Sequence, residues 1–144
     1  MNECPLSIET VALIRRALER SWSEKTSICY NPDIAPLSYG QCAPTAIVVF
    51  ETLGGEILRT EVAKKDGSTI RHFYNRIKRC RHDFTADQFA IPNYWCELVY
   101  KDLASSVEEA GTETLSSQLE AMRSAFKKAI EQEEMQANEV PQLN

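Results

Sequence analysis

Three residues of this sequence have the types and the order that acyl chemistry at a thiol requires. Cys42 directly precedes an apolar segment, His72 is one of only two histidines, and Asp83 follows further along the chain. A thiol nucleophile needs a base that takes its proton, and the base needs a third group that orients its ring. The sequence therefore offers Cys42 as nucleophile, His72 as general base and Asp83 as the orienting group.

The apolar segment after Cys42 decides whether its thiol is activated. By periodicity alone, residues 43–53 fit either a buried helix or a strand. Pro44 and Gly54 favour the helix, because proline suits a first helical turn and glycine a C-terminal cap. The free N–H groups and the dipole at the helix start would then favour a thiolate and could bind an oxyanion. The alternative is a small buried thiol without chemistry, since free cysteine is among the most buried residue types.

A hairpin follows and carries the histidine. Residues 56–62 and 69–77 are predicted to be strands joined at Asp66-Gly67, with a turn at 78–82 and a third short strand at 83–85. Neighbouring antiparallel strands lie about 5 Å apart, so His72 and Asp83 can be partners if the register allows it. A strand histidine and a turn aspartate without further roles are the plain alternative.

Two further helices are predicted near the ends of the chain. Ser7 can cap a first helix that runs to about Arg20, and residues 28–39 form an irregular loop after it. An apolar stripe predicts a C-terminal amphipathic helix over about residues 113–135, through Leu115, Leu119, Met122, Phe126 and Ile130. We expect this stripe to pack against the domain. The alternative is a homodimer in which two copies meet along the C-terminal helix.

Together these elements predict one α+β domain over residues 1–136. The chain of 144 residues has the length of a single domain and shows no internal repeat. The helix that begins at Cys42 is expected to pack on a small antiparallel sheet, and the long amphipathic helix closes the domain. Residues 137–144 are predicted to form a disordered tail.

The composition argues against several classes of function. Lys and Arg number 16 against 21 Asp and Glu, which gives a net charge of −5. Binding to nucleic acid or to an anionic membrane surface needs a basic excess instead. No apolar run approaches the ~20 residues that span a bilayer, and the start of the chain lacks the pattern of a signal peptide. We therefore expect a cytoplasmic protein whose partners include no nucleic acid and no membrane.

The cysteine count argues against a disulfide framework. An odd number without an export signal indicates free thiols in a reducing compartment. The five cysteines are Cys4, Cys29, Cys42, Cys80 and Cys96. A zinc site at Cys80, His82 and Cys96 is an alternative, although the spacing does not fit the usual paired ligands. We expect no metal and no organic cofactor, because no nucleotide, flavin or pyridoxal motif is present.

Five ordered motifs resemble the YunG family of small bacterial proteins. They are SWSEKTS (21–27), GQCAPTA (40–46), LGGEIL (53–58), HFYN (72–75) and DFTADQF (83–89). The resemblance runs from about Arg16 to Phe89, roughly half of the chain. The family is largely uncharacterised and has no established substrate, so membership by itself implies no activity.

The order of Gln-Cys, His and Asp also resembles papain-like and transglutaminase-like thiol enzymes, in which a cysteine begins a helix and the other two residues occupy neighbouring strands. This resemblance implies such a core here, with Cys42, His72 and Asp83 in catalytic roles. Gln41 would either help to bind the oxyanion or cap the helix. The implied function is a cysteine hydrolase or acyl-transfer enzyme for an amide or thioester, in a small molecule or a peptide. The alternative is a non-catalytic protein-binding or self-assembly module with the same fold.

Overall fold

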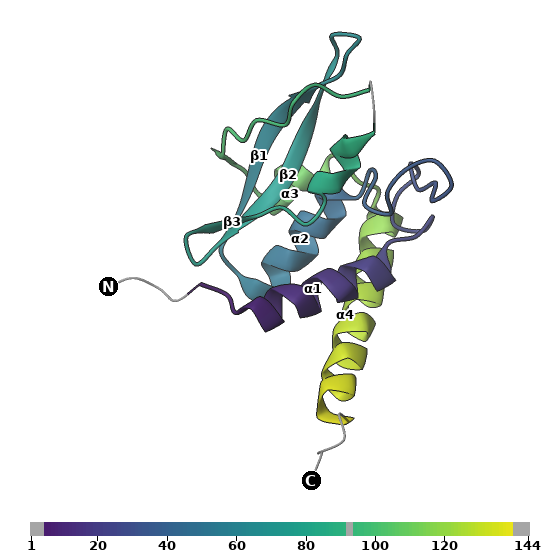
Figure 1. Cartoon of the computed structure of the whole chain (residues 1–144), viewed down its shortest axis with the longest axis vertical. Helices are drawn as coiled ribbons and strands as arrows, with labels where there is room; N and C mark the ends of the chain where they lie inside the picture. The colour runs from purple at the N-terminus through teal and green to yellow at the C-terminus, as the bar shows by residue number, and fades with distance from the viewer. Residues whose placement is uncertain (1–4, 92–93, 140–144) are drawn as a thin grey trace.

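A central helix, α2, packs against a four-stranded antiparallel sheet, and two more long helices lie beside it (Figure 1). The computed structural model describes residues 5–91 and 94–139. Its elements in chain order are α1 (Ile8–Ser21), α2 (Cys42–Leu53), β1 (Glu56–Ala63), β2 (Thr69–Ile77), β3 (Cys80–His82), the 3-10 helix η1 (Ala86–Ala90), β4 (Leu103–Ala104), α3 (Val107–Gly111) and α4 (Ser116–Glu139). The strand order in the sheet is β3-β2-β1-β4. The predicted α+β class, with a small antiparallel sheet and a C-terminal helix, is confirmed.

Helix α2 forms the centre of the core and begins at Cys42, as predicted. Every residue from Cys42 to Val49 is buried, and this burial outweighs the weaker helix propensity of the β-branched residues among them. The helix ends at Leu53 with Gly54 as its C-terminal cap, and the next residue, Gly55, has a positive φ of 82°. A Cβ atom at Gly55 would lie 2.2 Å from the backbone oxygen of Arg76, so only glycine fits this turn into β1.

Helix α1 begins as the sequence predicts and packs on α4. The Ser7 hydroxyl accepts a hydrogen bond from the backbone N–H of Thr10 at 3.0 Å, which caps the helix start. Ile14 and Leu18 of α1 share one core cluster with Met122 and Phe126 of α4. The middle of the C-terminal apolar stripe therefore packs within the chain. Self-association along this helix stays a prediction.

The C-terminal helix has different ends from those predicted. Helix α4 begins at Ser116 and not near residue 113, because α3 and the turn after it occupy the preceding segment. Residues 137–139 continue the backbone of α4, while residues 140–144 of the predicted tail lie outside the described residues. The elements α3 and β4 were not predicted, since five and two residues are too short to show a period.

The hairpin between β2 and β3 is tighter than the sequence indicates. Lys78 and Arg79 both have positive φ values, 50° and 69°, and form a two-residue turn that pairs Ile77 with Cys80. The third strand therefore starts directly at Cys80 and is complete at His82. The prediction of a strand over residues 83–85 is wrong, and Asp83 lies in the chain that leaves the sheet.

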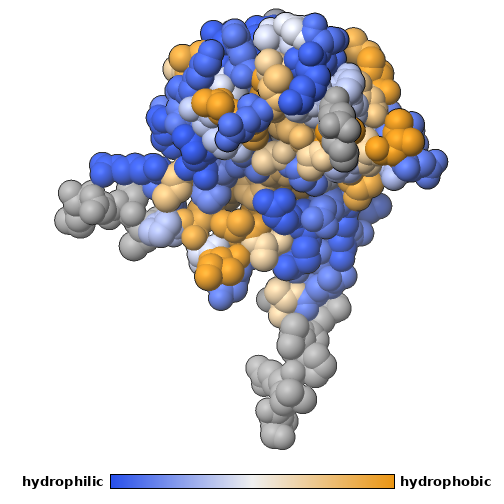
Figure 2. All heavy atoms as spheres, turned by 45° about the horizontal axis from the view of Figure 1, so that its top comes forward, coloured by the Kyte–Doolittle hydropathy of each residue, from blue (hydrophilic) through white to orange (hydrophobic). Residues whose placement is uncertain are grey.

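The surface mixes polar and apolar side chains. Figure 2 shows hydrophilic side chains over much of one face, with apolar side chains gathered in patches between them. A hollow of about 420 Å³ lies between α2 and α4, and its apolar lining includes Val48, Phe126 and Ile130. Within the described ranges, no helix is long and apolar enough to cross a bilayer.

Candidate functional site

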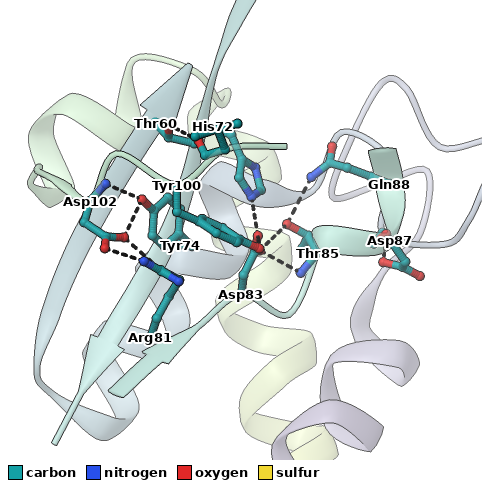
Figure 3. A network of polar contacts seen from close by, with 12 residues as sticks. Thr60, His72, Tyr74, Arg81, Asp83, Thr85, Asp87, Gln88, Tyr100 and Asp102 are labelled. Atoms are coloured by element: carbon teal, nitrogen blue, oxygen red, sulfur yellow. Dashed lines mark hydrogen bonds and ion pairs between the residues drawn. The ribbon is translucent and has the colours of Figure 1, made fainter. Parts of the chain in front are cut away.

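His72 and Asp83 form a buried pair at the open edge of the sheet (Figure 3). The Nε2 atom of His72 lies 2.7 Å from Oδ2 of Asp83, and the exposed fractions of the two side chains are 0% and 4%. Strand β3 pairs with β2 only as far as Asn75, so the chain after β3 is free to turn toward His72. The structure thus brings together the two residues that sequence order had proposed as partners.

The Asp83 carboxylate is held at both of its oxygens. Oδ1 accepts hydrogen bonds from the backbone N–H of Thr85 at 3.2 Å and from its hydroxyl at 3.4 Å. Oδ2 accepts from the Tyr100 hydroxyl at 2.7 Å as well as meeting His72. The Asp-x-Thr spacing is the signature of a local Asx turn, so Thr85 was detectable in the sequence. No short-range sequence pattern linked Tyr100 to Asp83.

The segment after Asp83 connects this pair to the loop before Cys42. Gln88 of η1 donates to the Thr85 hydroxyl at 3.0 Å and accepts from the backbone N–H of Gly40 at 3.2 Å. Phe89, the next residue of η1, meets the His72 ring edge-to-face with centroids 4.7 Å apart. The DFTADQF motif therefore positions the carboxylate, the imidazole and the loop that leads into α2.

Cys42 lies at the first turn of α2, where its side chain adjoins the imidazole. Burial lowers the pKa of His72, but the hydrogen bond with Asp83, the adjoining Cys42 side chain and the charges of both groups outweigh it and raise this pKa to about 9. His72 Nε2 is engaged by Asp83, so Nδ1 is the nitrogen left for the thiol. Nδ1 is buried and has no hydrogen-bond partner of normal geometry among the described residues. Catalytic hydrogen bonds are often long before substrate binds.

Gln41 precedes the thiol and is fully buried. It occupies the N-cap position of α2, but its side chain makes no capping hydrogen bond, so the predicted side-chain cap is absent. Its Nε2 points to the backbone oxygen of Ser23 at 3.4 Å, and its Oε1 has no partner among the described residues. An oxyanion role for Gln41 stays a prediction.

The start of α2 itself offers donors for an oxyanion. The first N–H groups of a helix have no partner within the helix, and here no side chain at the N-cap position satisfies them. Pro44 has no N–H, so Cys42 and Ala43 supply the N–H groups of this first turn, which have no partner within the helix. A negative charge beside the thiol would meet these two groups and the positive end of the helix dipole.

The first family motif, SWSEKTS (21–27), has a structural role next to the site. The indole N–H of the buried Trp22 donates to the Thr45 hydroxyl of α2 at 2.9 Å. Within the same motif, the Thr26 hydroxyl accepts from the Ser23 backbone N–H at 2.9 Å. The SWSEKTS motif thus fixes the end of α1 against the start of α2.

Two hollows adjoin the loop that leads into Cys42. The first, of about 330 Å³, has a mixed polar and apolar lining that includes Thr112 and Leu115. The second, of about 240 Å³, has a more apolar lining that includes Ile34 and Tyr39. Cys29 forms part of both walls. The lining of each hollow includes a residue of the loop before Cys42 but not Cys42 itself.

The zinc alternative can be compared with the arrangement of the described side chains. Within residues 5–91 and 94–139, no three His, Cys, Asp or Glu side chains cluster as a metal site requires, and this includes the Cys80–His82 alternative. The four cysteines in these ranges, which include Cys29 and Cys42, are free thiols, and Cys4 lies outside them.

The two histidines should titrate on opposite sides of the ordinary histidine value. We expect NMR of the imidazole protons to give a pKa of about 9 for His72. The pKa of His82 should lie below its ordinary value, because burial disfavours its charged form. His82→Gln assigns the two signals. Asp83→Asn weakens the main interaction that raises the His72 pKa, so this titration should move down. A wild-type His72 pKa at or below the ordinary value would contradict the arrangement.

Comparison with known proteins identifies the family. The model of the YunG protein family matches residues 10–131. The chain is 34% identical over 113 residues to a Bacillus subtilis (strain 168) protein named "Uncharacterized protein YunG", and this match covers 78% of the chain and 88% of that relative. No solved structure matches the chain, so a papain-like or transglutaminase-like core stays a prediction. The match over most of the length shows that the chain belongs to the YunG family.

Proposed function

We propose that this protein is a cysteine-dependent hydrolase or acyl-transfer enzyme that acts on an amide or a thioester. Cys42 is the nucleophile, His72 exchanges protons with it, and Asp83 fixes the ring. The observation that carries the proposal is the buried imidazole of His72. Its Nε2 is held by Asp83 at 2.7 Å, while its Nδ1 has no normal hydrogen-bond partner among the described residues and is the nitrogen left for the thiol. A buried polar atom left in this way calls for an explanation, and a proton-transfer role supplies one.

The protonation of His72 sets the order of events. At neutral pH an imidazole with a pKa of about 9 carries a proton, and the proposed resting state is an imidazolium beside the Cys42 thiolate. The sulfur attacks the carbonyl carbon, a C–S bond forms, and the carbonyl electron pair moves to oxygen. The backbone N–H groups of Cys42 and Ala43, at the start of α2, bind that oxyanion.

The leaving group and water complete the cycle. The oxyanion collapses, the bond to the amine or thiol leaving group breaks, and His72 gives that group its proton. The neutral imidazole then takes a proton from a water molecule, or from an acceptor amine or alcohol, as its oxygen or nitrogen attacks the carbonyl carbon of the acyl-enzyme and the carbonyl electron pair moves to oxygen again. Collapse of the second oxyanion releases the product acid or transferred acyl group, and returns the thiolate and imidazolium. We include a reducing, cytoplasmic location in the proposal, since the thiol must stay free.

Selective alkylation tests the nucleophile. Accessibility favours Cys29, which is exposed, over Cys42, which is 9% exposed. Activation by His72 and the helix start favours Cys42 instead. We therefore expect iodoacetamide at neutral pH to modify Cys42 faster than Cys29, measured by peptide mapping at short times. If Cys42 reacts no faster than Cys29 at any pH, the mechanism is excluded and a non-catalytic binding module is favoured.

A further inference from the structure

We propose that Tyr100 is a positioning residue of this site, whose hydroxyl fixes the Asp83 carboxylate oxygen that faces His72 and limits how strongly this oxygen holds the proton of the imidazole. The role rests on the proposed function, because positioning matters only if His72 moves protons. The Tyr100 hydroxyl donates to Oδ2 of Asp83 at 2.7 Å, and the same oxygen lies 2.7 Å from Nε2 of His72. Tyr100 and His72 therefore share one carboxylate oxygen.

Tyr100 is itself held from the side of the sheet. Its ring meets the Tyr74 ring edge-to-face at 4.9 Å, and the Arg81 guanidinium lies 4.3 Å from its centroid (Figure 3). Asp102 binds both of these neighbours, because it accepts from the Tyr74 hydroxyl at 2.8 Å and from Nε of Arg81 at 2.9 Å. Two strands thus supply a cradle in which the phenol ring has one orientation.

The backbone on either side of Tyr100 is fixed by Thr60. This buried hydroxyl donates to the backbone oxygen of Val99 at 2.7 Å and accepts from the N–H of Lys101 at 3.1 Å. Thr60 is the residue of β1 that pairs with His72 of β2. The same rung of the sheet therefore carries the imidazole and anchors the segment that brings Tyr100 to Asp83.

The hydroxyl has an electrostatic effect of predictable sign. A hydrogen bond from Tyr100 draws charge from the oxygen that faces His72, so it moderates how strongly the carboxylate stabilises the imidazolium. The titratable groups around the ring are Cys42 from α2, Asp83 after β3, and Tyr74 and Tyr100 on the sheet side. Of these groups, Tyr100 is the one that donates a hydrogen bond to Asp83, and its phenol is neutral at neutral pH.

Tyr100→Phe tests this inference through the titration of His72. The ring and its cradle remain, and only the hydroxyl is lost. We expect the pKa of His72 to rise by about half a unit or more, a change of about threefold in the proton dissociation constant. In the Asp83→Asn background the rise should disappear, because the carboxylate on which it acts is gone. Tyr30→Phe, in the loop after α1, is the matched control and should leave the titration unchanged.

A second variant weakens the Tyr100–Asp83 hydrogen bond without changing either of these two residues. Thr60→Val removes the two hydrogen bonds that fix the Tyr100 backbone, and we expect a smaller shift of His72 in the same direction. An unchanged or lowered His72 titration in Tyr100→Phe, or an equal rise in both backgrounds, would overturn the inference. The readout needs no turnover, so an inert Cys42 beside a shifted His72 would refute the proposed function and leave the Tyr100–Asp83 coupling standing.

Discussion

Cys42→Ala is expected to abolish acyl capture by this protein. Incubation of the unchanged protein with the activated ester p-nitrophenyl acetate should add one acetyl group to Cys42 and release nitrophenol in a burst. The variant should lose the adduct and the burst, with a rate lower by on the order of 10³-fold or more, because no other described thiol adjoins a histidine paired with a carboxylate. Intact-mass spectrometry and absorbance at early times measure both.

Cys80→Ala is the control for this experiment. Cys80 is a free, partly exposed thiol on β3 that has no place in the proposed mechanism. This variant should keep the wild-type burst and adduct. A burst of equal size in Cys42→Ala and in the unchanged protein would remove Cys42 from the proposed chemistry, wherever the acetyl group is found.

His72→Gln is expected to make Cys42 react with an alkylating reagent more slowly than Cys29, the reverse of the order expected for the unchanged protein. Glutamine fills a similar volume and can still donate to Asp83, but it cannot hold the thiol's proton. We expect alkylation of Cys42 at neutral pH to slow by about 10²-fold or more and to fall below that of the exposed Cys29. Peptide mapping after brief labelling compares the two sites within one sample.

The chain contains its own control for this substitution. His82 is the other histidine, and its ring stacks on Phe84 with centroids 5.9 Å apart. His82→Gln should leave the labelling order unchanged. Equal rates for Cys42 in the two variants would show that His72 does not activate the thiol.

Local signals in the sequence were sufficient to predict the helix that carries the proposed nucleophile and the strand that carries the proposed base. The Ser7 cap, the glycines after α2 and the Asp66-Gly67 turn each act within a few residues, so they predict α1, α2 and the β1–β2 hairpin correctly. The third strand was misplaced, because the tight turn at Lys78 and Arg79 depends on two positive φ values that neither residue type favours.

Contacts between segments that lie far apart in the chain could not be predicted from the sequence. The segment that holds Tyr100 shows no helical or strand period, and its position depends on Thr60 of β1. The cradle around Tyr100 joins residues of β2, β3 and the later segment, with Asp102 at its centre. No short-range pattern encodes such a cluster, since each member satisfies a partner far away in the chain.

The sequence alone established the family motifs, the α+β class and the order of a thiol, a histidine and an aspartate. The tertiary structure decided that His72 and not His82 meets Asp83, because β3 ends early and releases the chain toward the buried ring. It also set the direction in which the pKa of that ring moves, because burial lowers this pKa and the interactions with Asp83 and Cys42 raise it by more. The balance between those opposing effects depends on distances and solvent exclusion, which exist only once the chain has folded.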